Sequence, residues 1–128
     1  MPEILDTPSA PRPVGPYSIA VESNGFVFLS GQVALDPATS ERAPDEIEAQ
    51  TRRVLDNIGL VLDDLGLDHS DIVKTTVFLA DMADYPVVND VYAGYFGDRP
   101  PARSAVQAAG LPGGFLIEIE AIAARRTS

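Results

Sequence analysis

The sequence predicts an α+β fold in which a single mixed β-sheet has two helices packed on one of its faces. Runs of β-branched and aromatic residues within 17–33, 71–79 and 100–126 are typical of strands. Apolar residues recur every three to four positions within 44–66 and 81–96, which is the period of a helix with one buried face. The chain order is therefore β-β-α-β-α-β-β, as expected for one sheet covered by two helices.

The chain has 128 residues and is predicted to form one domain, 1–128, with an extended N-terminal segment at 1–13. Four prolines prevent a helix in that segment. No apolar run reaches the ~20 residues of a membrane span, and the first residues lack the basic-then-apolar pattern of a secretory signal. We therefore expect a soluble, cytoplasmic protein with no membrane partner.

The charged and metal-binding residue types exclude several functions. The net charge is −10 and the basic residues form no stripe, which disfavours nucleic acid as a partner. Cysteine is absent, so disulfides and zinc–cysteine sites are excluded. His69 is the only histidine, which excludes a metal site built on a histidine pair. It lies in LGLDHSD, where a solvated surface turn is the simplest interpretation.

The first predicted element is a hairpin at 17–33, in which Asn24 and Gly25 supply the positive φ angles of a tight turn. Its second strand ends at Ser30-Gly31-Gln32. The small residues at this end allow a ligand or another strand to approach the backbone closely.

Two helices follow the hairpin. The first is predicted to begin near Pro44 or Asp45 and to end at Gly66, which favours the left-handed conformation beyond a helix terminus. The second has Asp81 or Asp84 as its cap and a proline in its first turn. Between them, the β-branched run at 71–79 is typical of a central strand.

The stretch at 100–126 predicts two strands joined by a Gly/Pro-rich loop, and it holds the residues most suited to chemistry. Arg103 lies in the first strand, and Glu118 and Glu120 lie in the second. Because side chains alternate along a strand, the two glutamates share a face about 7 Å apart. The remainder of their strand is apolar, which predicts burial on both faces. From these residues alone, an ion pair between Arg103 and one glutamate is favoured over a role in binding a carboxylate ligand.

Six motifs in register resemble the RidA (YjgF-type) family of enamine/imine deaminases over about 13–126. They are VGPYS, SGQ, DIVKTTVFL, VVNDVYAGYF, PPARSAVQ and IEIEAIA. The resemblance implies the chorismate-mutase-like mixed sheet of the RidA fold. It also implies a homotrimer with sites in the clefts between subunits, and no metal or organic cofactor.

The resemblance implies two catalytic residues. Arg103 matches the arginine that holds the substrate carboxylate, and Glu118 matches the glutamate that positions water beside the substrate. Glu120 remains the alternative residue for handling that water. Ala105 departs from the cysteine that is frequent in the deaminase branch, which leaves the substrate preference open.

Five further residues are implied to bind substrate. Ser30 matches a serine that hydrogen-bonds the ligand, Tyr17 supplies a ring wall and a hydroxyl, and Asn89 matches a helical asparagine near the pocket. Backbone groups near Gly31 and Ser104 are expected to approach the ligand.

The predicted function is hydrolytic deamination of small 2-imino acids and their enamines. Examples are 2-iminobutanoate, 2-iminopropanoate and 2-aminoacrylate, which would give 2-keto acids and ammonia. Two alternatives remain open at this stage. One is a non-catalytic trimer that binds a carboxylate metabolite for regulation. The other is a pathway-specific deaminase acting on a larger imino or amino acid.

Overall fold

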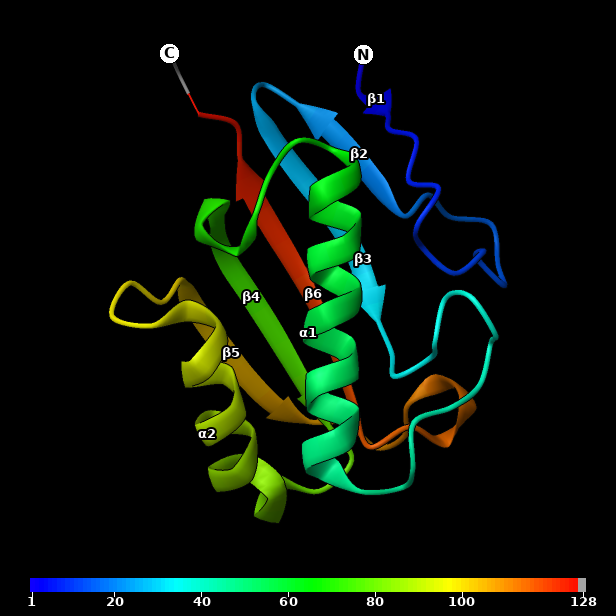
Figure 1. The fold of residues 1–128 in the computed structure, drawn as a ribbon, viewed down its shortest axis with the longest axis vertical. Helices are drawn as coiled ribbons and strands as arrows, with labels where there is room; N and C mark the ends of the chain where they lie inside the picture. Colours follow the sequence, from blue (N-terminus) through cyan, green and yellow to red (C-terminus); the bar gives the residue numbers. More distant parts are fainter. Residues whose placement is uncertain (127–128) are drawn as a thin grey trace.

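The computed structural model describes residues 1–126 and contains a six-stranded mixed sheet with two α-helices on one face (Figure 1). The strand order is β1-β2-β3-β6-β4-β5, and β4 runs parallel to β5 while the other neighbours are antiparallel. The elements are β1 Glu3–Ile4, β2 Ala20–Ser23, β3 Phe26–Gln32, α1 Ile47–Asp64, β4 Ile72–Leu79, α2 Tyr85–Phe96, β5 Ala102–Gln107 and β6 Ile117–Ala124. The predicted α+β class, with one mixed sheet and both helices on one face, is confirmed.

The hairpin of β2 and β3 forms as predicted, with φ angles of 53° at Asn24 and 80° at Gly25. The N-terminal segment was predicted only to be extended. Within it, Glu3 and Ile4 add a short strand to the free edge of β2. Further along the segment, the backbone N–H and hydroxyl of Ser9 both donate to the Asp64 carboxylate at the end of α1, at 2.8 Å each.

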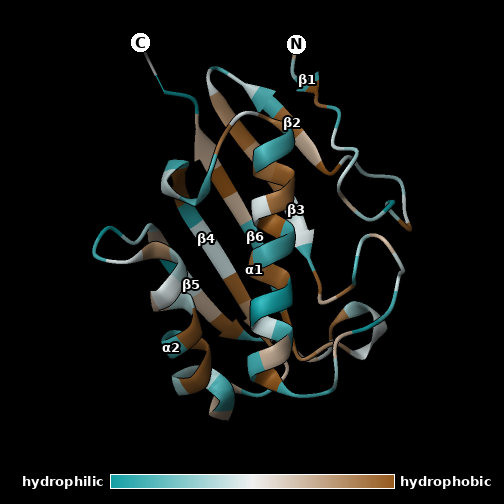
Figure 2. Cartoon of the chain, in the orientation of Figure 1, coloured by the Kyte–Doolittle hydropathy of each residue, from teal (hydrophilic) through white to brown (hydrophobic). Residues whose placement is uncertain are grey.

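Helix α1 begins later than predicted because Glu46, not Pro44 or Asp45, supplies the N-terminal cap. The Glu46 carboxylate accepts from the backbone N–H groups of Glu48 and Ala49 at 2.9 and 3.2 Å. The helix ends as predicted, with Gly66 at a φ of 75°. Figure 2 shows hydrophilic and hydrophobic residues alternating along α1, as expected for a helix with one buried face.

Two buried polar residues of α1 hold the ends of the central strands. Gln50 Oε1 accepts from the backbone N–H of Leu116, one residue before β6, at 2.9 Å. Asn57 Nδ2 donates to the carbonyls of Val33 and Leu35, just after β3, at 3.2 and 2.7 Å. Because both side chains are fully hydrogen-bonded in the core, they fix the helix against β3 and β6.

The entry to α2 uses one of the two predicted capping residues. The Asp81 carboxylate accepts from the backbone N–H of Ala83 at 2.9 Å and caps a short 3₁₀ turn, Met82–Asp84. Helix α2 continues directly from this turn, and Asp84 makes no side-chain cap of its own. Pro86 lies in the first turn of α2, as predicted.

His69 is not a solvated loop residue, and that prediction was wrong. Its ring is half-buried, and Nε2 lies 2.9 Å from the carbonyl oxygen of Leu55 in α1. The ring also packs edge-on against Tyr95 and Phe96 of α2, at centroid distances of 5.5 and 5.8 Å. Gly59 makes room for it, because a Cβ there would lie 2.7 Å from the ring. His69 therefore joins the two helices.

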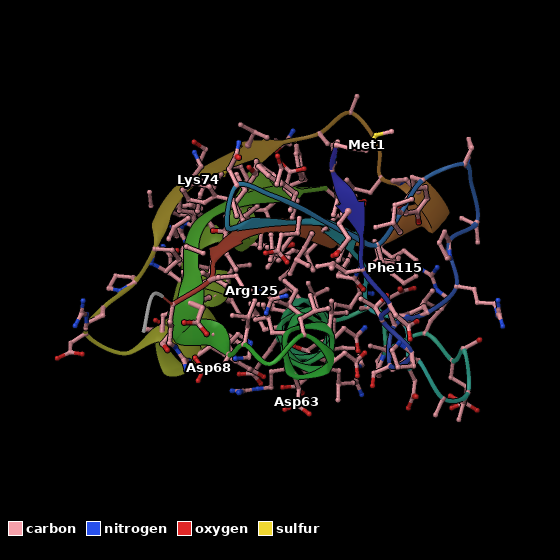
Figure 3. All side chains as sticks on the ribbon, turned by 90° about the horizontal axis from the view of Figure 1, so that it is seen from above. Met1, Asp63, Asp68, Lys74, Phe115 and Arg125 are labelled. Carbon is pink, nitrogen blue, oxygen red and sulfur yellow. The ribbon has the colours of Figure 1, made fainter. Side chains whose placement is uncertain are left out.

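The face of the sheet away from the helices, here called the open face, remains accessible in the single chain. Ile117 and Ile119 of β6 are buried beneath the helices, whereas Glu118 and Glu120 point to the open face. Phe26 and Phe28 of β3 also lie on it and are 45% and 44% exposed. Figure 3 shows Lys74 on this side of the sheet and α1 on the other. β6 was predicted to be buried on both faces. In the single chain only its helix-covered face is buried.

None of the helices in residues 1–126 is both long enough and apolar enough to cross a membrane.

Candidate active site

Arg103 lies on the helix-covered face of the sheet, at the edge strand β5. In the parallel pairing of β4 and β5 it is the register partner of Thr75. Thr75 is buried, and its hydroxyl lies 2.7 Å from the hydroxyl of Tyr92 in α2. Because register partners point to the same face of a sheet, Arg103 also points toward α2.

Helix α2 holds the Arg103 guanidinium with neutral groups. Nη2 donates to the Tyr85 hydroxyl at 2.9 Å and to Asn89 Oδ1 at 2.8 Å. The guanidinium carbon lies 4.7 Å from the centroid of the Tyr92 ring, within the range of a cation–π contact. A hollow of about 310 Å³ opens beside these groups, with Phe96, Pro100 and Pro101 as its apolar walls.

The ion pair that the residues alone favoured, between Arg103 and Glu118 or Glu120, does not form, because these residues lie on opposite faces. Glu118 is the register partner of Phe78, and Glu120 that of Thr76, one position on either side of the Val77–Ile119 pair buried beneath the helices. Among residues 1–126 no acidic side chain forms a salt bridge with Arg103. Its charge is therefore left uncompensated by the described chain.

A bulge in β3 places two of the predicted binding residues beside the glutamates. Leu29 pairs with Ala121 and Gln32 with Ile119, so β3 has one extra residue between these two pairs. Ser30 lines a hollow of about 300 Å³ together with Glu120. Gly31 lies so close to Glu118 that a Cβ at position 31 would overlap the Glu118 carboxylate. The absence of a side chain at Gly31 is what lets the carboxylate occupy this place.

The open-face hollow is also lined by a positively charged side chain, that of Lys74. Its polar walls are Ser18, Ser30, Lys74, Thr76 and Glu120. The Ser30 hydroxyl donates to the carbonyl of Ser18 at 2.6 Å, which fixes its orientation. Lys74 Nζ donates to the Ser104 hydroxyl at 3.3 Å, so Ser104 points to the open face although its neighbour Arg103 points to the helices.

The remaining predicted positions are not gathered into either hollow. Tyr17 lies in the loop before β2 and is 47% exposed. Ala105 shares the face of Arg103 and is half-buried against the hydrophobic core. The described chain thus brings Asn89 to Arg103, and Ser30 and Gly31 to the two glutamates, as two separate clusters on opposite faces of the sheet.

Two features of its surroundings raise the pKa of the Glu118 carboxyl. Burial raises the pKa of its carboxyl above the usual glutamate value, and the negative charge of Glu120 raises this pKa further.

Three residues near these hollows were not predicted as site residues: Tyr85 and Tyr92, which contact Arg103, and Lys74, which lines the open-face hollow. A signal for the tyrosines was present in the sequence. Tyr85 and Tyr92 lie four residues before and three residues after Asn89, and this spacing places all three side chains on one face of a helix.

The structure is therefore that of a small α+β protein with a charged hollow of ligand size on each face of its sheet. The endoribonuclease L-PSP family (Ribonuc_L-PSP) matches residues 7–125. The chain belongs to this family, which includes the RidA and YjgF proteins, and the resemblance carried by the six motifs is confirmed.

Individual relatives support the assignment over almost the whole chain. The Reactive Intermediate Deaminase A of Arabidopsis thaliana is 48% identical, over 94% of this chain and 65% of that protein. The 2-iminobutanoate/2-iminopropanoate deaminase of Mus musculus is 44% identical, over 94% of this chain and 90% of the mouse protein. The crystal structure of Escherichia coli TdcF with bound serine superposes with a TM-score of 0.89 at 39% identity, covering 97% of this chain and 99% of that one.

Proposed function

We propose that this protein hydrolyses small 2-imino acids, and the enamines in equilibrium with them, to 2-keto acids and ammonia. The observation that carries the proposal is that the positive charge of Arg103 has no acidic partner in the described chain. Neutral side chains hold its guanidinium beside a hollow, and no salt bridge neutralises it within residues 1–126. Such a guanidinium is suited to binding a carboxylate. Imine deaminase names among relatives at about 45% identity support the same chemistry.

We propose that the complete site needs more than one chain. Arg103 and Glu118 lie on opposite faces of one sheet, so they cannot both touch a small substrate within the same molecule. We propose a homotrimer in which the Arg103 edge of one copy lies against the open face of the next. The exposed Phe26 and Phe28 supply apolar area for this contact. Light scattering of the purified protein tests the assembly, and a monomer at micromolar concentration would contradict it.

The reaction proposed for this shared site proceeds in two steps. Arg103 of one copy holds the substrate carboxylate, and Glu118 of the neighbouring copy orients a water molecule toward the C=N carbon. The protonated imine is the form attacked: as the water oxygen bonds to the carbon, the C=N π electrons move to the nitrogen and Glu118 accepts a proton from the water, giving a neutral carbinolamine. Glu118 returns this proton to the nitrogen, the C–N bond breaks, and ammonia leaves as the hydroxyl proton passes to solvent and the keto acid forms.

The other predicted residues have supporting roles in this proposal. Asn89 orients Arg103 through the Nη2 hydrogen bond. Gly31 leaves the space that the Glu118 carboxylate occupies, and Ser30 lines the open-face hollow. The backbone near Ser104 adjoins Arg103 in β5 of the same copy, whereas Tyr17 would approach the substrate only across the contact between copies.

Faster release of 2-keto acid is the expected result when the purified protein is added to a threonine or serine dehydratase reaction. The buffer is chosen to slow spontaneous imine hydrolysis, and keto acid is followed with time. General acid–base catalysis of this kind contributes about 10²–10⁴-fold. Arg103→Ala should lose this acceleration. Its matched control is Arg52→Ala, which removes an exposed arginine of α1 that pairs with Glu48 at 3.7 Å. No acceleration with either dehydratase would contradict the proposed activity.

The pH dependence of the reaction tests the assignment of Glu118. Glu120→Gln removes a negative charge that raises the Glu118 pKa, so this pKa falls. Because the ionised carboxylate is the form that accepts a proton, the acid limb of kcat/KM shifts to lower pH in the variant. Glu48→Gln removes the same charge at an exposed position on α1 and leaves the limb in place. An acid limb that did not move in Glu120→Gln would mean that another group controls it.

One observation favours substrates larger than the two- to four-carbon imines. The hollow beside Arg103 extends along apolar walls formed by Tyr92, Phe96 and two prolines, with room for a hydrophobic side chain. A series of amino acid oxidase products of increasing size would measure this preference. Activity confined to the smallest imines would argue against it.

A further inference from the structure

The hydrogen bonds of Arg103 restrict how a carboxylate can reach it. A guanidinium binds a carboxylate with two parallel N–H groups, either from Nε and Nη2 or from Nη1 and Nη2. Both arrangements use Nη2, and its two N–H groups are already donated to Tyr85 and Asn89. In this conformation neither fork is free. A carboxylate therefore needs either to displace one partner or to use that partner as part of its own site.

We propose that Tyr85 is a substrate-binding residue whose hydroxyl completes the carboxylate site of Arg103; this inference rests on the proposed function. The hydroxyl accepts from Nη2, and its own proton has no hydrogen-bond acceptor among residues 1–126. One carboxylate oxygen takes this proton, and the other takes an N–H from Nη1 or Nε. The hydroxyl thereby replaces the Nη2 position of the ordinary fork and keeps it connected to the arginine.

Position and exposure distinguish Tyr85 from Asn89 in this role. Asn89 binds Nη2 through its carbonyl oxygen, which has no proton to offer, and its bond to Arg103 is partly buried. Tyr85 is 36% exposed at the first residue of α2, and its bond to Arg103 is at the surface. Asn89 is therefore the fixed support of the guanidinium, and Tyr85 is the partner that an incoming ligand meets.

This arrangement has a consequence for specificity. A neutral hydroxyl donor beside a positive guanidinium gives two donors and one positive charge, which match the acceptors and the negative charge of a carboxylate. A ligand whose carboxylate is replaced by an amide offers one acceptor oxygen and an NH₂ group. This NH₂ group would face the donor groups of Tyr85 and Arg103. The hydroxyl therefore discriminates carboxylates from neutral analogues.

Tyr85→Phe removes the hydroxyl and retains the ring, whose centroid lies 5.3 Å from the guanidinium carbon. The experiment measures calorimetric dissociation constants for 2-oxobutanoate and for its neutral amide, together with KM and kcat for the imine. We expect 2-oxobutanoate to bind about 10-fold more weakly to the variant, as for loss of one hydrogen bond to a charged group. KM should rise by a similar factor with kcat unchanged, and the weak binding of the amide should not change.

Tyr95→Phe is the matched control, because it removes a tyrosine hydroxyl from the same helix that bonds Asp56 at 2.7 Å, away from Arg103. Unchanged or tighter binding of 2-oxobutanoate to Tyr85→Phe would overturn the inference, since the hydroxyl would then be idle or in competition with the ligand. In that case binding that is still lost in Arg103→Ala would leave the proposed function standing. Absence of Arg103-dependent binding in the unsubstituted protein would overturn both.

Discussion

We expect Glu118→Gln to lower kcat/KM for 2-imino acids by about 10²–10⁴-fold, the usual contribution of a general acid–base group. Glutamine keeps the size and polarity of the side chain but cannot accept a proton from water. Binding of the product-like 2-oxobutanoate should remain within about twofold, because the proposed site holds the carboxylate through Arg103 and not through Glu118. The measurement is the dehydratase-coupled rate together with the calorimetric dissociation constant.

The same substitution separates three interpretations of the protein. Full activity in Glu118→Gln combined with loss in Glu120→Gln would assign the water to Glu120. A metabolite-binding module without turnover would have no rate to lose, while its ligand affinity would survive the change. Loss of activity and binding together would indicate that the carboxylate supports the fold of the site rather than the chemistry.

Stability provides an independent check on Glu118. Since the folded state raises the pKa of Glu118, the protein is most stable when this carboxyl is protonated and loses that stability as pH rises through the raised pKa. Glutamine stays neutral at every pH. We therefore expect the Tm of Glu118→Gln to exceed that of the unsubstituted protein at neutral pH, with the difference disappearing below about pH 4, where glutamate is protonated in both states.

We expect Arg103→Ala to weaken the binding of 2-oxobutanoate and of the proposed imine substrate by roughly 30- to 4,000-fold. Loss of one partner from a hydrogen-bonded charge pair costs about 2–5 kcal/mol, and each 1.4 kcal/mol is a factor of ten in affinity. Arg103→Lys retains the charge without the planar donor group, so its affinity should lie between those of the unsubstituted protein and Arg103→Ala. Affinity in Arg103→Ala equal to that of the unsubstituted protein would place the carboxylate elsewhere.

Mixing the two inactive variants tests whether the site is shared between copies. A site that joins Arg103 from a Glu118→Gln chain to Glu118 from an Arg103→Ala chain contains both functional groups. After co-refolding at equal amounts, random assembly gives about a quarter of the normal sites. Recovery of about that share of activity is expected, and no recovery would contradict a shared site.

The elements predicted well are those whose signals are local. Asn24-Gly25 and Gly66 adopt the positive φ angles that their residue types favour, and the strands and helices follow from the period of their apolar residues. The errors and omissions lie where distant parts of the chain meet. Two residues of β1 pair through their backbone and carry no side-chain pattern. The polar neighbours of His69 suggested a surface turn, yet α1 and α2 enclose its ring, and Gly59 in mid-helix was the available signal.

The site was predictable in its residue types but not in its geometry. Strand alternation correctly placed Glu118 and Glu120 on one face. The face of Arg103 depends on its pairing with Thr75 and on the contact between Thr75 and Tyr92, which no local pattern reports. For the same reason the favoured ion pair of Arg103 with a glutamate was wrong, although the residue types suited it.

The open-face hollow depends on the one extra residue that the bulge adds to β3, because this residue changes which face the following side chains point to. In a regular strand, Ser30 and Gly31 would point to opposite faces, and Gln32 would leave the core that it now occupies with Leu29. With the extra residue, the alternation of side chains restarts after Gly31, and Gln32 points to the core as Leu29 does. The number of residues between Leu29 and Gln32, as much as their identity, determines where the Glu118 carboxylate rests.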